Sequence, residues 1–176
     1  DEVDLAVICV PAISVNDIIH QCHQKNIRGC VIISSGFKES GPDGIIREKE
    51  LKNLGREYGI RIIGPNCFGI INCDPDISMD CTFARNLSNR GNVGFISQSG
   101  TVGASFLEEL RHTSMGFSLF ITLGNRCDFD ENEALLYLRD DPNTRLIFLY
   151  LESFKDPYKF IEIVKKITPY KPVVIL

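Results

Sequence analysis

The stretch that decides the fold is Val-Gly-Phe-Ile-Ser-Gln-Ser-Gly-Thr-Val-Gly at residues 93–103. It predicts a buried strand, a turn of hydroxyl residues and glycine, and then a helix. The same alternation of short apolar runs and helical patterns recurs along the chain. Strands are expected at 5–10, 30–33, 60–63, 93–96, 117–123, 146–151 and 173–176, and helices at 15–26, 45–58, 101–113, 131–139 and 157–167. Because parallel strands need crossover connections, the pattern predicts an α/β fold with parallel sheets.

One long interruption, residues 72–92, carries Pro75 and little periodicity. It predicts two units, at 1–75 and 92–176, joined by a linker at 76–91. The first would hold three of the expected strands and the second four. Each unit is small for a closed α/β domain and the chain does not begin with Met, so we expect a piece of a longer protein.

Composition excludes several classes of protein. The 176 residues are 44% hydrophobic and 24% charged, which is ordinary for a globular chain and rules out disorder. The net charge of −4 and the lack of any basic run longer than Lys165-Lys166 exclude nucleic-acid and anionic-membrane partners. No apolar stretch reaches the roughly 18 residues of a membrane span. The seven cysteines are odd in number and several lie in apolar runs, which favours reduced thiols and a cytoplasmic protein.

Ligands of open parallel sheets bind beyond the carboxyl ends of the strands, and here those ends carry small polar residues. In the turn at 97–101, backbone N–H groups and a helix N-terminus would cradle a phosphate or carboxylate without a lysine. The structural alternative, at about even odds, is an ordinary cap in which Ser97 or Ser99 bonds its own backbone. A nucleophile elbow is disfavoured, because Ser97 and Thr101 stand where glycines are needed.

The histidines do not predict a metal site. His20 and His23 share one face of the expected helix while Cys22 points elsewhere, and there is no Cys-x-x-Cys motif. A solvated or packed helix face is the favoured interpretation. His112, near the end of the helix that follows the turn, suits the negative end of the helix dipole.

Two acidic features also follow expected strands. Glu152 lies directly after the run 146–151, where a carboxylate could orient or stabilise an imidazole, although a surface glutamate at the start of a loop fits equally well. Asp128, Asp130 and Glu131 could bind a cation or cap the next helix, and capping is favoured.

Taken in order, the motifs resemble those of the NDP-forming acyl-CoA synthetases, including ADP-forming acetyl-CoA synthetase and, more distantly, the α subunit of succinyl-CoA synthetase. They are VDLAVICVPA (3–12), VIISSGFKE (31–39), RIIGPNCFGIIN (61–72), GNVGFISQSGTVGASFLEEL (91–110), LGNRCDFDENEALLYLRDDPNTRLIFLYLE (123–152) and KPVVIL (171–176). The resemblance implies a partial Rossmann-like CoA-binding domain followed by a partial flavodoxin-like, succinyl-CoA ligase-like domain.

The resemblance also implies roles for residues at the strand ends. Coenzyme A would be bound by Val10, Pro11, Ser34, Ser35, Gly36 and Asn66. The phosphate of a phosphohistidine would be held by Ser99, Gly100 and Thr101. Glu152 matches the glutamate that pairs with that histidine.

In this family, acyl-CoA, phosphate and NDP are interconverted with carboxylic acid, CoA and NTP through an acyl phosphate and a phosphohistidine. The resemblance implies CoA and a small carboxylic acid as substrates, ADP/ATP and Mg²⁺ bound through an ATP-grasp domain or subunit, and a homo- or hetero-oligomer. The phosphorylated histidine is expected just after residue 176, and the ATP-grasp portion is also outside this chain, so the piece alone should be inactive. Ala104 stands where the succinyl-specific subunit has a bulky aromatic, which favours a monocarboxylic acid such as acetate.

Two other functions stay open at this point. One is a CoA-binding regulatory module, for example one fused to a protein acetyltransferase, that keeps the scaffold without ligase turnover. The other is an assembly subunit that binds no ligand. Extending the reading frame past residue 176 to look for the histidine separates the first, and titration with CoA separates the second.

Overall fold

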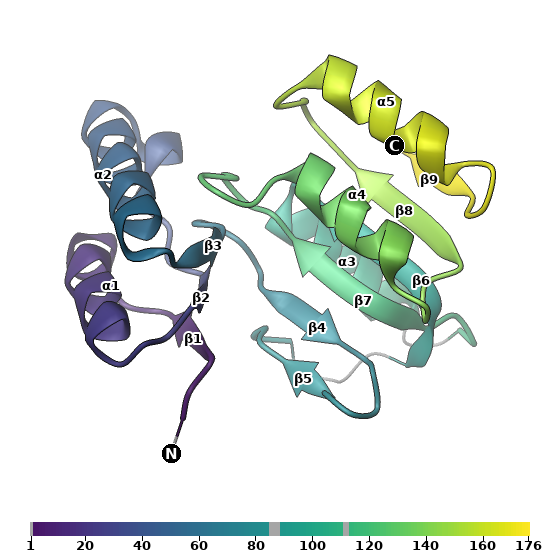
Figure 1. Cartoon of the computed structure of the whole chain (residues 1–176), viewed down its shortest axis with the longest axis horizontal. Coiled ribbons are helices and arrows are strands. Elements are labelled where there is room, and N and C mark those ends of the chain that lie inside the picture. Colours follow the sequence, from purple (N-terminus) through teal and green to yellow (C-terminus); the bar gives the residue numbers. More distant parts are fainter. Residues whose placement is uncertain (1, 85–88, 111–112) are drawn as a thin grey trace.

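The first sheet is parallel and lies at the N-terminal end of the chain. In the computed structural model, which describes residues 2–84, 89–110 and 113–176, its order is β1 (Leu5–Ile8), β2 (Gly29–Ile32), β3 (Arg61–Ile63). The connections run through the helices α1 (Val15–Gln24) and α2 (Pro42–Tyr58), with short 3₁₀ turns η1 (Ala12–Ser14) and η2 (Lys38–Ser40) before them. Both helices cover the same side of this sheet (Figure 1).

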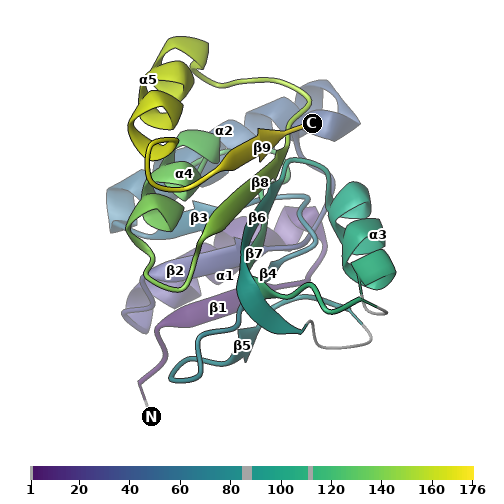
Figure 2. The same ribbon diagram turned by 90° about the vertical axis from the view of Figure 1, so that its right-hand side faces the viewer.

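The second sheet is mixed. Its order in the described residues is β5 (Met79–Asp80), β4 (Ile70–Asn72), β7 (Phe117–Thr122), β6 (Arg90–Ser97), β8 (Leu146–Tyr150), β9 (Val173–Ile175). Strands β6 to β9 are mutually parallel, whereas β4 runs antiparallel to both β5 and β7. Helix α3 (Gly100–Leu110) lies on one side of this sheet, and α4 (Glu131–Asp140) and α5 (Pro157–Ile167) lie on the other (Figure 2).

Each helix packs through one apolar stripe. Val15, Ile19 and Cys22 follow the i, i+4, i+7 spacing of one α1 face and are buried against the first sheet. The α3 side of the second sheet is largely aromatic, and Phe95 stacks there on Phe120 at 5.0 Å between ring centroids. The opposite side is filled by aliphatic residues from β6 to β8, α4 and α5. The second sheet therefore has an apolar core on each face, one covered by α3 and the other by α4 and α5.

The seven strands and five helices expected from the sequence are all present, with ends that differ by a few residues. Strands β4 and β5 were not expected. They have only three and two residues, too few to show the period of a strand. The second sheet thus takes in residues 70–72 and 79–80, which the sequence analysis placed in the first unit and in the linker. The end of the helix expected at 101–113, including His112, extends beyond the described residues.

The loop after β7, an interior strand of the second sheet, joins the two sheets by running beside β3, the edge strand of the first. Backbone N–H groups of this loop donate to the β3 region, from Cys127 to Gly64 O at 3.0 Å and from Phe129 to Ile62 O at 3.1 Å. Asp128 adds an ion pair with Arg61 at 2.9 Å. The carboxyl ends of both sheets therefore face a common region. Among the described residues, no helix is long and apolar enough to cross a membrane.

Candidate functional site

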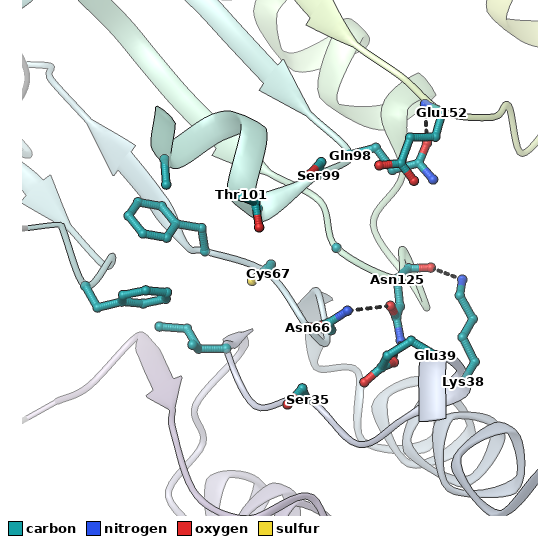
Figure 3. A pocket seen from close by; sticks show the side chains of 16 residues that line it. Ser35, Lys38, Glu39, Asn66, Cys67, Gln98, Ser99, Thr101, Asn125 and Glu152 are labelled. Carbon is teal, nitrogen blue, oxygen red and sulfur yellow. Dashed lines mark hydrogen bonds between the residues drawn. The ribbon is translucent and has the colours of Figure 1, made fainter. Parts of the chain in front are cut away.

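A cavity of about 670 Å³ lies where the carboxyl ends of the two sheets meet (Figure 3). The residues that follow β2, β3, β6, β7 and β8 supply most of its wall. The lining residues are Ile33, Ser35, Lys38, Glu39, Asn66, Cys67, Phe68, Phe83, Gln98, Ser99, Gly100, Thr101, Ala104, Gly124, Asn125 and Glu152. This is the position at which open parallel sheets bind ligands.

The turn before α3, where the sequence predicts an anion cradle, is held by two serine side chains. The hydroxyl of Ser97 donates to Ser99 O at 2.7 Å, and Ser99 Oγ accepts from the Val102 N–H at 3.2 Å. Ser99 thus caps the helix, as the structural alternative expected, but this cap satisfies only one of the N–H groups in the first turn of α3. Among the described residues, none accepts a hydrogen bond from the N–H groups of Gly100 or Thr101. These two donors and the positive end of the helix dipole face the cavity.

Glu152 is held at the rim by Gln98. The side-chain oxygen of Gln98 accepts from the N–H groups of Glu152 at 3.0 Å and Ser153 at 3.1 Å. Gln98 N in turn donates to Tyr150 O at 2.8 Å, so the ends of β6 and β8 are fixed to each other. This leaves the Glu152 carboxylate exposed at the cavity, on the same side as Ser99 (Figure 3).

The expected CoA residues of the first unit are divided by the structure. Ser35 and Asn66 line the cavity, whereas Val10, Pro11, Ser34 and Gly36 do not. The hydroxyl of Ser34 instead donates to Val10 O, tying the end of β2 to the end of β1. Gly36 has a φ of +104°, so it shapes the loop that carries Ser35.

Cys67 also lines the cavity, although its thiol is unreactive. Its side chain is 4% exposed and donates to Ile32 O at 3.4 Å. Burial raises the pKa of Cys67 to about 12, so the thiol is neutral at physiological pH. The side chain is therefore part of the wall and is no nucleophile.

A polar clamp, absent from the sequence expectations, closes the cavity floor between the two units. Asn125 Nδ2 donates to Glu39 at 2.5 Å and to Glu48 at 2.7 Å, and its Oδ1 accepts from Asn66 at 3.4 Å. Lys38 Nζ donates to the Asn125 carbonyl. Burial opposes ionisation of Glu39, but hydrogen bonds from Asn125 and the Phe37 and Gly36 N–H groups prevail and lower its pKa.

Gly124, beside this clamp, is required by close approach. Its φ is +56°, and a Cβ there would lie 2.3 Å from Pro65 O and 2.5 Å from Asn66 O. Any side chain would push the second unit away from the Gly-Pro-Asn turn of the first. Gly124 and Asn125 directly follow an apolar run, and this position in the sequence marked them as strand-end residues. The sequence did not indicate which residues they contact.

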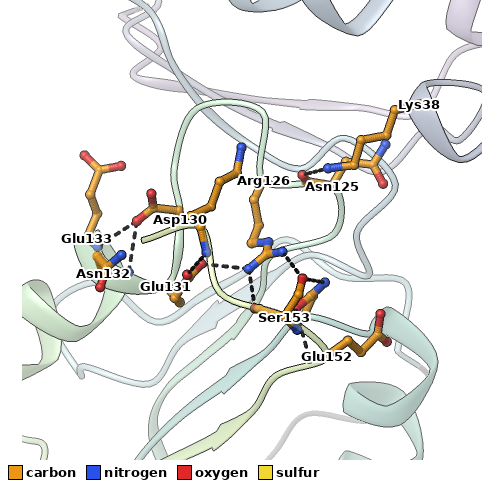
Figure 4. Close-up of polar contacts among 11 residues, drawn as sticks. Lys38, Asn125, Arg126, Asp130, Glu131, Asn132, Glu133, Glu152 and Ser153 are labelled. Carbon is orange, nitrogen blue, oxygen red and sulfur yellow. Dashed lines mark hydrogen bonds and ion pairs between the residues drawn. The ribbon is translucent and has the colours of Figure 1, made fainter. Parts of the chain in front are cut away.

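Beneath the Glu152 loop lies a buried ion pair (Figure 4). Arg126 Nη1 contacts Glu131 Oε2 at 2.8 Å, with side-chain exposures of 6% and 0%. The same guanidinium donates to Ser153 O and to Ser153 Oγ, both at 2.8 Å. Glu131 also accepts from the Lys155 N–H at 2.6 Å. The pair therefore anchors the loop on which Glu152 stands.

Other acidic residues near the start of α4 have structural roles. Asp130 accepts from the N–H groups of Asn132 at 2.9 Å and Glu133 at 3.2 Å, which confirms the expected cap.

His20 and His23 both contact Tyr58, the first through a 2.8 Å hydrogen bond and the second by stacking at 4.1 Å. Both histidines are exposed, so the expected solvated or partly packed helix face is confirmed for them. In the part of the chain that the structure describes, no cluster of three His, Cys, Asp or Glu could hold a metal ion.

The geometry defines a class: two α/β units whose strand ends share one ligand cavity. Comparison with known proteins gives each unit a family. Residues 1–72 match the model of a CoA binding domain, and residues 90–176 match that of a succinyl-CoA ligase like flavodoxin domain. Each unit therefore belongs to the domain family whose model it matches, and together the two matches leave only residues 73–89 uncovered.

The similar proteins carry the same pair of domains within longer chains. The chain is 44% identical over 175 residues to the α subunit of Acetate–CoA ligase [ADP-forming] II of Pyrococcus furiosus, covering 99% of this chain and 38% of that one. It is 40% identical to Acetate–CoA ligase [ADP-forming] I of Archaeoglobus fulgidus, covering 100% of this chain and 25% of that one.

A solved structure, the dinucleotide forming Acetyl-coenzyme A synthetase 1 of Ca. Korarchaeum cryptofilum in complex with phosphate and ADP, superposes with a TM-score of 0.94 at 34% identity. The match covers 100% of this chain and 38% of that chain. The chain thus spans between about a quarter and two fifths of the relatives it matches.

Proposed function

We propose that this chain is part of an acyl-CoA synthetase of the ADP-forming, acetate–CoA ligase type. The complete protein would interconvert acyl-CoA, NDP and phosphate with a carboxylic acid, CoA and NTP. The observation that carries the proposal is the single cavity in which a CoA-binding unit and a helix N-terminus with free donors face each other. A thioester and a phosphate must meet for acyl phosphate to form, and this cavity can hold both.

The roles proposed for the first unit concern CoA. Ser35 and Asn66 would contact the part of CoA nearest the reacting thioester, because both line the cavity. The other expected CoA residues would act indirectly, because they shape the strand ends and the loop that carries Ser35. These residues are Val10, Pro11, Ser34 and Gly36. The Glu39–Asn125 hydrogen bond would keep this loop at a fixed distance from the second unit.

In the second unit, the N–H groups of Gly100 and Thr101, with Ser99 at the cap, would hold the phosphoryl group. Hydrogen bonds from a helix N-terminus bind an anion without a full opposing charge, so the group can be released again. Glu152 would accept a hydrogen bond from the imidazole that carries the phosphoryl group. Neither described histidine can serve as that carrier, since His20 and His23 contact Tyr58 and do not line the cavity.

The acyl end of the substrate would lie against the apolar part of the cavity. Phe68 and Phe83 meet there edge to face at 4.4 Å between ring centroids, and Ala104 also lines the cavity. Among the described residues, Phe68, Phe83 and Ala104 of this wall offer no charge to a second carboxylate, which favours a monocarboxylic acid such as acetate over succinate. The small side chain of Ala104 leaves room between the cradle and the rings.

The remaining components are proposed for the whole protein. ADP/ATP and Mg²⁺ would bind an ATP-grasp domain or subunit, since the described residues offer no metal cluster. The protein would act as a homo- or hetero-oligomer. Its seven cysteines are free, which suits the reducing cytoplasm. We further propose residues 1–75 as the CoA-binding part and 92–176 as the ligase part, with 76–91 between them.

The test is Glu152→Gln in the full-length protein. If Glu152 pairs with the phosphorylated imidazole, phosphoenzyme formation from ATP should fall by about 10²-fold or more, the range for a general acid–base or charge-stabilising partner. CoA affinity, measured by calorimetry, should stay within about twofold of wild type because the amide keeps the same shape.

The matched control is Glu162→Gln, which makes the same change on the exposed face of α5. It should alter neither quantity. Equal losses of phosphoenzyme and CoA affinity in Glu152→Gln would contradict the role given to Glu152. A complete protein that binds CoA but forms no phosphoenzyme would contradict the ligase proposal itself.

A further inference from the structure

A second cavity, of about 500 Å³, lies between α2 and the loops that follow β7 and β8. Four lysines line it: Lys38 before α2, Lys49 and Lys52 on α2, and Lys155 after β8. Glu48 and Cys127 complete the charged and titratable part of the lining. Neither family model nor the proposed ligase chemistry assigns a role to this cavity.

The lysines outnumber the charges that could neutralise them. Glu48 is already engaged, because its carboxylate contacts Lys38 Nζ at 3.7 Å and accepts from Asn125 Nδ2 at 2.7 Å. Among the described residues, none pairs with the ammonium groups of Lys49, Lys52 or Lys155. Three positive charges therefore face the cavity uncompensated, in a chain whose net charge is −4.

The base of the cavity adds no negative charge. Cys127 is 2% exposed, and burial, with Glu48 and Asp128 adding to it, raises the pKa of its thiol to about 12. The thiol is therefore neutral at physiological pH.

Lys49 and Lys52 are three residues apart, so they share one face of α2 and lie together at this wall of the cavity.

The lysines repel one another. Partial burial lowers the pKa of Lys155, and the charges of Lys38, Lys52 and Arg126 lower it further, against a smaller opposing effect of Asp130. Like charges gathered without partners reduce folding stability, so an arrangement of this kind is relieved by a bound anion. The energetic cost in the free protein becomes binding energy when the anion arrives.

We propose that this cavity binds a small phosphate-bearing anion with two or more negative charges. A recess of this size between two loops and a helix suits a metabolite better than a flat protein surface. Lys38 lines this cavity and the first one, and its Nζ donates to Asn125 O in the interdomain clamp. Occupation of the lysine cavity would therefore bear on the loop that carries Ser35.

The experiment is calorimetric titration of the 176-residue chain with pyrophosphate in buffer without divalent cations. Wild type should show saturable binding at the lysine cavity, in addition to any binding at the α3 N-terminus, with an affinity that falls as salt rises. The double variant Lys52→Gln/Lys155→Gln should bind at least about tenfold more weakly, because two charge-assisted contacts are lost. Lys165→Gln/Lys166→Gln, which removes the same charge from exposed positions on α5, should bind like wild type.

A measurement on wild type alone keeps the test valid if a variant fails to fold. Pyrophosphate should protect Lys52 and Lys155 from reductive methylation, read by peptide mass spectrometry, and should leave Lys165 unprotected. The proposal is overturned if wild type shows no saturable binding, if the Lys52→Gln/Lys155→Gln variant binds as wild type does, or if protection does not distinguish the cavity lysines from Lys165.

Discussion

Replacing Glu131 with Gln should destabilise the fold far more than a similar change at an exposed ion pair. Glu131 is fully buried, and it pairs at 2.8 Å with Arg126, which is 6% exposed. The substitution keeps the shape and one acceptor oxygen but removes the charge. A buried guanidinium is then left without its counter-ion, because no other described carboxylate forms an ion pair with Arg126.

The magnitude follows from the geometry. At 2.8 Å and an effective dielectric constant of about 20, the gross attraction between two unit charges is about 6 kcal/mol. Removing one partner of a buried pair costs about 3–5 kcal/mol net. We expect about 3 kcal/mol, the lower end, because Arg126 keeps its hydrogen bonds to Ser153 O and Oγ.

Urea unfolding, followed by circular dichroism, measures this loss. With a slope of about 2 kcal/mol per M for a chain of this size, the midpoint should fall by about 1.5 M. The control is Asp140→Asn, which removes the charge from an equally short pair with Arg139 at 2.6 Å, where both side chains are exposed. Its midpoint should stay unchanged within error, since solvent screens the pair.

Burial is thus the property that distinguishes the two variants. If Glu131→Gln shifts the midpoint no more than Asp140→Asn, the Arg126–Glu131 pair is not desolvated as the structure shows. The anchoring of the Glu152 loop would then need another explanation.

Two further predictions concern the same region. Because folding lowers the pKa of Glu39 from its usual 4.5, its ionised carboxylate stabilises the fold above that pH, and this stabilisation is lost as the pH falls through the folded-state pKa. Glu39→Gln should therefore make the free energy of unfolding less dependent on pH in this range. Urea midpoints measured from pH 6 to 3 test this. Thr122→Val should lower the free energy of unfolding by about 2–5 kcal/mol, because the N–H groups of Phe68 and Gly69, each 2.8 Å from Thr122 Oγ1, would lose their acceptor. Exposed Thr168→Val is its control, and an equal effect there would contradict the assignment.

Periodicity was enough to predict the parallel strands and their helices. Apolar runs such as Val93 to Ile96 mark strands covered on both faces, and the structure covers them on both faces. The sequence did not predict strands β4 and β5, because two or three residues are too few to show the alternation of a strand. The capping role of Asp130 was also visible, since its side-chain hydrogen bonds are local.

The site was predictable only as far as strand ends indicate it. Ser99 and Glu152 follow apolar runs, so the sequence placed them near one another. The partners of Arg126 and Asn125 lie up to 87 residues away from them in sequence, and no local pattern indicates such contacts. Arg126 also has a φ of +57°, an uncommon value for a residue with a side chain, which its buried contacts hold in place.

The most direct test of the shared cavity is a crystal structure of the protein with CoA and phosphate. We predict phosphate within hydrogen-bond distance of the Gly100 and Thr101 N–H groups, and the thiol end of CoA beside Ser35 and Asn66 in the same cavity. CoA bound with its thiol outside this cavity, or phosphate absent from the α3 N-terminus at saturating concentration, would contradict the account.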